Sequence, residues 1–401
     1  MISRRIFLQF ASAASLALGS RTAHAANAPG VTDTEIKIGQ TMPYSGPGSS
    51  YGLLGRAEAA CFQMINEQGG VNGRKLTLVS LDDAYSAPKT VEQTRRLIEQ
   101  EQVAFIFGQF GGFTGLAVRQ YLNDNKIPQL FGATAADIVG DPERYPWTIG
   151  LNPAISTEAH IYAKYILANN PNGKIAVLYQ NDALGKGFVT GMHEGVGAAN
   201  APMIVKEASY ELSDPTVDSQ IITLQGSGAD TLIIGATNKA AAQAIRKAAD
   251  LGWSPDRFLF NGASSIVGTL KPAGLEKSKG VITANYGKDP NDPRWKDDPG
   301  IKQWQAFASK YLNAADFTNV IGLYGFTAGL LIAQVLKQCG DDLSRENIMR
   351  QALNIKGFAG PGGLPGATID TSPSNYFPIR QLWLSRFNGE SWELFGNLLS
   401  D

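Results

Sequence analysis

Short apolar runs alternate with helical patterns along this chain, and the alternation limits the fold more than any other feature of the sequence. Runs such as 103–107 and 231–235 are rich in apolar residues and lack polar alternation, which is typical of strands buried on both faces. The segments between the runs have helical periodicity, and segment 53–68 ends at Gly69-Gly70, a common helix stop signal. Strands and helices in this order build parallel sheets covered by helices, so the sequence predicts an α/β fold.

Three stretches rich in Pro and Gly interrupt the alternation, at 145–153, 286–300 and 357–366. Strand–helix units lie on both sides of the first stretch, and further helical patterns lie between the second and the third. We therefore expect two lobes joined by three crossings that form a hinge. Lobe one is predicted to comprise residues 31–150 and 286–357, and lobe two residues 151–285 and 358–401. A hairpin is expected near the end of the chain, with strands Tyr376–Phe387 and Ser391–Leu394 joined at Asn388-Gly389.

The first 25 residues have the pattern of a cleavable export signal. A charged start containing Arg4-Arg5 is followed by a short apolar run and by Ala23-His24-Ala25, a small-x-small cleavage pattern. The paired arginines before Ile6-Phe7-Leu8 resemble the twin-arginine signal, although Gln9 stands where that motif usually has Lys. An ordinary secretory signal is the alternative. Either signal predicts a protein that works in the periplasm.

Composition excludes several classes of function. Removal of residues 1–25 removes three arginines and no acidic residue, which changes the formal net charge from −1 to −4. No basic tract is present, so we expect no nucleic-acid partner. The sequence contains no histidine or cysteine spacing typical of metal sites and no phosphate-binding glycine motif, so we expect no metal and no cofactor.

Two further features allow two interpretations each. Cys61 and Cys339 could form one disulfide in an oxidising compartment, or they could be two buried thiols, which we favour. The apolar stretch Val320 to Leu336 is shorter than a typical membrane span and contains Tyr324 and Thr327, so a buried core helix is the better interpretation.

Several motifs occur in an order and spacing that indicate a known family: Ile36 to Pro47, Gly69 to Arg74, Leu81-Asp82-Asp83, Pro128 to Thr134 and Tyr162 to Ile166. With them, the chain resembles type I periplasmic solute-binding proteins of the leucine/isoleucine/valine-binding group, which are receptors of ABC transporters. The resemblance implies two doubly wound parallel-sheet lobes, three crossovers and a ligand cleft between the lobes. It also implies a small-molecule ligand, a membrane permease of an ABC importer as partner, a monomer and no catalysis.

Ligands of open α/β sheets bind beyond the carboxyl ends of the strands, where helix N-termini present free N–H groups. The expected ligand-binding residues of lobe one are Tyr51, Gln109, Phe110, Gly112, Phe113, Gly132 and Thr134. Those of lobe two are Asp182, Leu184, Thr237, Gly262 and Tyr286. The resemblance places Gly112, Gly132 and Thr134 where the family holds the carboxylate and ammonium of an amino acid.

The chain differs from amino-acid receptors in lobe two. By resemblance, Gly262 occupies the place of a glutamate that binds the ligand's ammonium, and Leu184 and Thr237 occupy the places of tyrosines. Asp182 is the alternative acid. Because a buried cation without a partner is costly, we expect a small or aromatic organic acid as ligand, with an amino acid as the next candidate.

Two other functions fit parts of the sequence. Gly48-Ser49-Ser50-Tyr51-Gly52 matches the G-x-S-x-G pattern of serine esterases, with Ser50 as nucleophile. The only histidines after the signal are His160 and His193, both far from the end of the chain, so we do not expect an enzyme. A protein that presents a ligand to a chemoreceptor is the other alternative, and the sequence does not separate it from a transport receptor.

Overall fold

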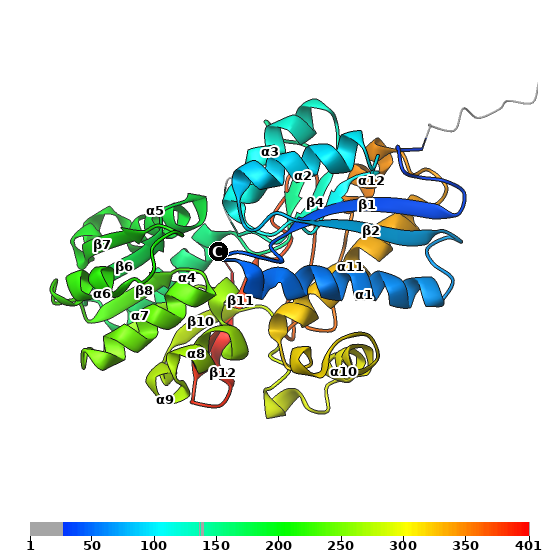
Figure 1. Cartoon of the computed structure of the whole chain (residues 1–401). Coiled ribbons are helices and arrows are strands. Elements are labelled where there is room, and N and C mark those ends of the chain that lie inside the picture. The colour runs from blue at the N-terminus through cyan, green and yellow to red at the C-terminus, as the bar shows by residue number, and fades with distance from the viewer. Residues whose placement is uncertain (1–26, 136, 138–139, 401) are drawn as a thin grey trace, which may run out of the picture.

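The computed structural model describes residues 27–400 except 136 and 138–139. The predicted signal peptide, residues 1–25, lies outside the described residues. The chain forms two lobes, each built around its own sheet, and the lobes lie side by side (Figure 1).

The first sheet contains five parallel strands in the order β2-β1-β3-β4-β5. Its strands are β1 Glu35–Met42, β2 Lys75–Asp82, β3 Ile106–Phe107, β4 Gln129–Gly132 and β5 Thr148–Gly150. Strands β3, β4 and β5 are buried along their whole length, and the apolar runs of β3 and β4 predict this burial. The strand order places β1 inside the sheet with later strands on both sides, which is the doubly wound arrangement.

The second sheet contains seven strands in the order β12-β11-β10-β9-β8-β6-β7. Its strands are β6 Ile175–Gln180, β7 Ile204–Tyr210, β8 Thr231–Gly235, β9 Asp256–Leu259, β10 Ile282–Asn285, β11 Gln381–Phe387 and β12 Trp392–Ser400. Strands β6 to β10 are parallel, whereas β11 is antiparallel to both of its neighbours. The predicted terminal hairpin is present, and Gly389 in its turn has a φ of 111°.

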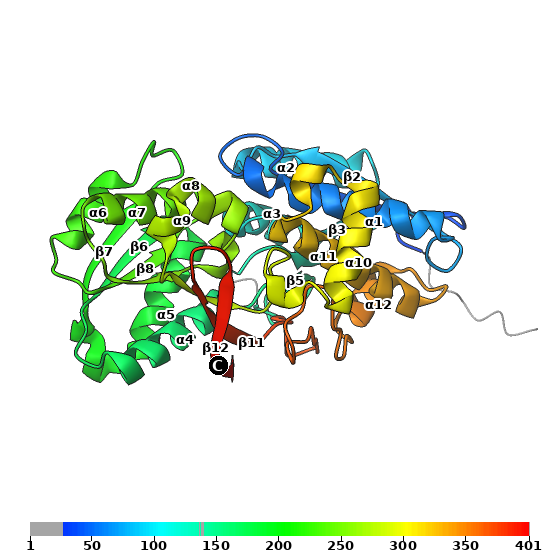
Figure 2. The ribbon, with the colours of Figure 1, turned by 90° about the horizontal axis from the view of Figure 1, so that it is seen from below.

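Helices cover both sheets. The first seven helices are α1 Gly52–Glu67, α2 Ala87–Glu99, α3 Gly112–Asp124, α4 Ile155–Asn169, α5 Ala183–Asn200, α6 Asp218–Gln225 and α7 Asn238–Asp250. They are followed by α8 Lys271–Ala273, α9 Leu275–Ser278, α10 Pro299–Tyr311, α11 Val320–Cys339 and α12 Arg345–Ala352. Helices α4 to α9 belong with the second sheet, and α10 to α12 return to the first (Figures 1 and 2).

Helix α11 is the apolar segment that the sequence assigned to a core helix. It packs lengthwise against α1, and Phe326 stacks on Phe307 of α10 with ring centroids 4.1 Å apart. By length and composition it is the one helix of the described residues that could cross a membrane, but 67% of its most apolar window is buried. Its place between α1, α10 and α12 is that of a core helix in a folded lobe.

The chain crosses between the lobes three times, as predicted. Two of the crossings lie beside each other, because Lys288 N–H donates to the Gly362 carbonyl (2.7 Å) and Leu364 N–H donates to the Tyr286 carbonyl (2.9 Å). The third crossing is longer than the predicted break. It still contacts the first lobe at Tyr376, whose hydroxyl donates to the Pro146 carbonyl, and it joins the second sheet only at β11.

The structure differs from the sequence-based expectations in three places. Strand β5 lies inside the stretch 145–153 that was predicted to be irregular, and β10 was not predicted. The first strand of the hairpin begins at Gln381 instead of Tyr376.

Cys61 and Cys339 are both buried and free, which confirms the interpretation as two thiols. Burial raises the pKa of the Cys339 thiol to about 12, so this thiol stays protonated at neutral pH.

Candidate functional site between the two lobes

A cavity of about 110 Å³ lies between the lobes, at the carboxyl ends of the strands of both sheets. Lobe one contributes Tyr51, Tyr85, Phe110, Gly111, Gly112 and Thr134, and the second lobe contributes Leu184, Thr237, Phe260, Asn261, Gly262 and Ser264. The crossings and helix α11 close the remaining side with residues such as Asn152, Tyr286, Tyr324, Thr327, Phe358 and Gly360. None of the described residues that line this cavity carries a charged side chain.

The wall in lobe one is the N-terminus of α3. Gly111 is the residue before the helix, has a φ of 100° and offers no side chain to cap the first turn. The first N–H groups of a helix have no partner within the helix and carry the positive end of its dipole. Because Gly111 and Gly112 line the cavity, the backbone there can approach an anion closely.

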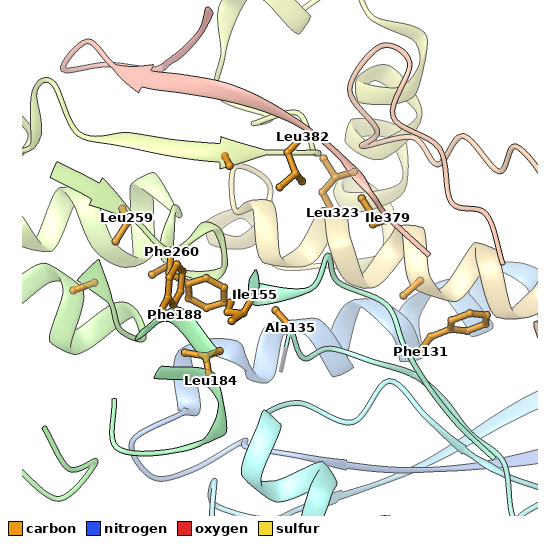
Figure 3. Packing of buried hydrophobic residues seen from close by; sticks show 14 of the residues in the cluster. Phe131, Ala135, Ile155, Leu184, Phe188, Leu259, Phe260, Leu323, Ile379 and Leu382 are labelled. Atoms are coloured by element: carbon orange, nitrogen blue, oxygen red, sulfur yellow. The ribbon is translucent and has the colours of Figure 1, made fainter. Parts of the chain in front are cut away.

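Aromatic rings flank this N-terminus. Tyr51, in the short helical turn Ser49–Tyr51, stacks on Phe110 with ring centroids 4.1 Å apart and an interplanar angle of 22°. On the opposite side, Tyr286 of the second crossing stacks on Tyr324 of α11 at 5.5 Å. The floor between the lobes is apolar, where Leu184, Phe188 and Phe260 gather beside Ile155 and Ala135 (Figure 3).

Among the residues that the structure describes, the wall in the second lobe has no acidic side chain that lines the cavity. Asp182 is the N-cap of α5, where its carboxylate accepts from the N–H groups of Leu184 (3.0 Å) and Gly185 (3.1 Å) and from Gln180. Burial raises the pKa of Asp182, against the effect of these hydrogen bonds. The side chain therefore stabilises the start of the helix instead of lining the cavity.

A buried carboxyl group lies directly behind the cavity wall. Glu158 Oε1 of α4 accepts from the N–H of Asn261 (2.7 Å) and from the Tyr162 hydroxyl (2.6 Å). Burial raises the pKa of Glu158 to about 8. Glu158 thus holds Asn261, a residue of the cavity wall, in place.

The structure brings together eight of the twelve residues predicted to bind ligand: Tyr51, Phe110, Gly112, Thr134, Leu184, Thr237, Gly262 and Tyr286 all line the cavity. The other four lie near it. Phe113 packs on Tyr85, and the Gln109 side chain bonds Thr41 and Gln129 inside lobe one. Gly132 lines a smaller neighbouring cavity, and Asp182 caps α5.

Most residues on the side of the cavity formed by the crossings and helix α11 were not predicted from the sequence. Tyr324 and Thr327 lie on α11, whose apolar pattern indicates a core helix without showing which face borders a cavity. The capping role of Asp182 could have been predicted from the sequence, because an aspartate directly before a helical pattern is a common N-cap.

Tyr51 links the two lobes across the cleft. Its hydroxyl lies 2.9 Å from Asn238 Oδ1 and 3.2 Å from the Gly262 carbonyl, and it accepts from the Asn238 N–H (3.2 Å). Asn238 begins α7 and Gly262 follows β9, so both partners belong to the second lobe. The described conformation is therefore a closed one, with Tyr51 as a latch between the lobes.

We expect Tyr51→Phe to shift the ligand-free protein toward an open form, because it removes every hydrogen bond that the Tyr51 hydroxyl makes across the cleft. Each such bond contributes on the order of 1 kcal/mol. Small-angle scattering should show a larger radius of gyration for Tyr51→Phe than for the unchanged protein.

The matched control for the latch is Tyr44→Phe. The Tyr44 hydroxyl bonds Ser80 (2.7 Å) within lobe one, so its loss should leave the radius of gyration unchanged. Equal radii for Tyr51→Phe and Tyr44→Phe would contradict the latch.

The esterase arrangement is not assembled. Ser50 Oγ lies 3.5 Å from Asn238 Nδ2. The histidines of the described part of the chain contact glutamates, His160 with Glu194 and His193 with Glu207. No group of three metal-binding side chains occurs between residues 27 and 400 where the structure is described.

A family profile described as "Periplasmic binding protein" matches residues 35–391. The chain belongs to the periplasmic binding protein family. This periplasmic binding protein is 25% identical over 326 residues to Leu/Ile/Val-binding protein homolog 7 of Brucella abortus, with 77% of this chain and 79% of the relative covered. The match confirms the resemblance to the leucine/isoleucine/valine-binding group.

Solved structures show the same fold for this periplasmic binding protein. A branched-chain amino acid ABC transporter protein from Thermus thermophilus with bound valine has a TM-score of 0.83 at 15% identity, over 92% of this chain and 98% of that one. A fatty acid ABC transporter substrate-binding protein from Thermomonospora curvata has a TM-score of 0.76 at 18% identity, over 94% and 95%. One of these neighbours holds valine and the other is a fatty acid receptor, so the shared fold does not by itself specify a ligand.

Proposed function

We propose that this protein is the extracytoplasmic receptor of an ABC importer and that it captures a small carboxylate-bearing solute by closure of its two lobes. The observation that carries the proposal is the cavity between the lobes, which has a helix N-terminus on one wall and no charged side chain among its described lining residues. A carboxylate fits the N-terminus of α3, and an apolar or aromatic body fits the stacked rings. The family and the related transport receptors support the same function.

We propose an organic acid in preference to an amino acid. An α-ammonium enclosed in this cavity would have no carboxylate beside it, since Asp182 caps α5 and Gly262 carries no side chain. An unpaired buried cation is strongly unfavourable. An amino acid remains the second candidate because the Thermus thermophilus neighbour has bound valine.

Calorimetry with matched ligands tests this function. 3-Phenylpropionate and phenylalanine differ only in the α-ammonium group, and 3-phenylpropionamide removes the carboxylate charge. We expect the acid to bind at least tenfold more tightly than both, a difference of about 1.4 kcal/mol. Micromolar binding of leucine or phenylalanine without binding of 3-phenylpropionate or benzoate would overturn the organic-acid proposal, and turnover of esters would favour the hydrolase instead.

The partner and the route of export complete the proposal. The closed receptor docks as a monomer on a membrane permease. In the alternative function, the ligand-bound protein docks on a chemoreceptor. Export through the twin-arginine route is proposed from Arg4-Arg5.

We propose the predicted lobe boundaries, 31–150 with 286–357 and 151–285 with 358–401, with one change. The contacts of Tyr376 favour a third crossing that extends to about Arg380.

A further inference from the structure

Two residues that line the cavity each carry a buried side-chain oxygen with no hydrogen-bond partner among the described residues: Asn261 Oδ1 and Thr327 Oγ1. Both atoms are buried, and Asn261 as a whole is only 4% exposed. Buried polar atoms in folded proteins are almost always hydrogen-bonded, and an unsatisfied one destabilises the structure. Because both residues line the cavity, polar groups of a ligand are the partners to test for these oxygens.

The remaining groups of Asn261 are all engaged within the protein. Its N–H donates to Glu158, its Nδ2 donates to Asn285 Oδ1 (2.6 Å), and its carbonyl accepts from the Ser264 N–H (2.9 Å). These bonds fix the orientation of the side chain, so the oxygen that remains is an acceptor held in one place. An oxygen of this kind is satisfied only by a hydrogen-bond donor, such as an O–H or an N–H of a ligand.

Thr327 provides a second polar position on a different wall. It lies on α11 close to Gly360, where a methyl group added to Gly360 would meet Thr327 Cγ2. A threonine hydroxyl inside a helix commonly bonds the carbonyl four residues earlier, but Thr327 Oγ1 makes no such bond. The hydroxyl therefore has no partner within the described chain, at the end of the cavity that α11 forms.

We propose that Asn261 and Thr327 determine specificity, and that the solute carries neutral hydroxyl or N–H groups in addition to its carboxylate. The inference rests on the proposed function, because the carboxylate at α3 sets which end of the solute reaches these atoms. A neutral donor is favoured over an ammonium because no described lining residue is acidic. Among aromatic acids, hydroxylated acids satisfy this requirement and their parent acids do not.

Calorimetry with two ligand series tests the inference: benzoate against 4-hydroxybenzoate and 3,4-dihydroxybenzoate, and 3-phenylpropionate against its 4-hydroxy and 3,4-dihydroxy derivatives. We expect at least one hydroxylated acid to bind about tenfold or more tightly than its parent. Parents that bind as tightly as all their hydroxylated derivatives would overturn the inference and leave the proposed function standing. Failure of every acid to bind would overturn both.

Variants assign the preference to these residues. Thr327→Val keeps the shape of the side chain and removes the hydroxyl, and Asn261→Ala removes the acceptor. Each should reduce the ratio of affinities for hydroxylated and parent acid by about tenfold. Thr269→Val is the matched control, because Thr269 Oγ1 is also buried and unpartnered within the described chain but does not line the cavity. If Asn261→Ala does not fold, the test rests on Thr327→Val. An unchanged ratio of affinities for hydroxylated and parent acid in Thr327→Val contradicts the proposal.

Discussion

Replacing Gly111 with alanine should lower the affinity for the ligand at least 100-fold. Gly111 has a φ of 100°, and a Cβ atom there would lie 2.6 Å from both Tyr85 Cε2 and Thr114 Oγ1. Relief of this clash requires movement of the first turn of α3, whose N–H groups form the proposed carboxylate site. A strained positive φ also costs about 1–3 kcal/mol of stability. Calorimetry measures the affinity, and chemical denaturation measures the loss of stability.

Gly228→Ala separates the two effects. Gly228 also has a positive φ, 72°, but a Cβ atom there would meet nothing within 4 Å, and the residue does not line the cavity. This variant should lose on the order of 1 kcal/mol of stability and retain full affinity. If Gly111→Ala binds ligand as tightly as Gly228→Ala does, the N-terminus of α3 is not the ligand site.

The free energy of unfolding should fall as the pH rises from about 4.5 to about 8. Glu158 is buried, and its pKa is raised from the ordinary value of 4.5 to about 8. The folded protein therefore holds this proton more tightly than the unfolded chain does. The resulting stabilisation is complete below pH 4.5 and is lost as the pH passes through the folded pKa. A shift of this size corresponds to a change on the order of 5 kcal/mol.

Glu158→Gln tests this pH dependence, because glutamine keeps an oxygen that can accept from Asn261 and Tyr162 and has no proton to lose. Thermal melting between pH 5 and 9 should show a flatter profile for this variant and a higher melting temperature than the unchanged protein at pH 9. Some slope should remain, since burial also raises the pKa of Glu58 well above its ordinary value. Glu92→Gln, at an exposed position of α2, is the control. Parallel profiles for all three proteins would refute the role of Glu158.

Local patterns were sufficient to predict most of the architecture. Apolar runs and capping glycines predict the alternation of strands and helices because each depends on neighbouring residues. Strand β5, Thr148–Gly150, could not be recognised because its three residues follow Tyr145-Pro146 and form a strand only by pairing with β4. Strand β10 also depends on distant partners, β9 and β11.

The site was predictable where it coincides with the ends of strands and starts of helices. Gly112, Thr134 and Thr237 occupy such junctions, whose position relative to the cleft follows from the fold class. Asn261 and Thr327 differ, because their significance lies in one side-chain oxygen each that no other residue bonds. Such a property depends on all surrounding elements at once and has no pattern in the sequence.

The pairing of two crossings constrains how the lobes can move. Residues 286–288 and 362–364 form a two-stranded ribbon, tied by the bonds of Lys288 and Leu364 and by the bridge between Gly287 and Gly363. Such a ribbon can bend perpendicular to its plane without breaking the hydrogen bonds between its strands. Sliding of one strand past the other would break those bonds. Motion of the lobes is then close to rotation about a single axis. Solutes of different size would then change the angle of closure but not its axis. A docking partner would therefore meet closed forms that differ only in that one angle.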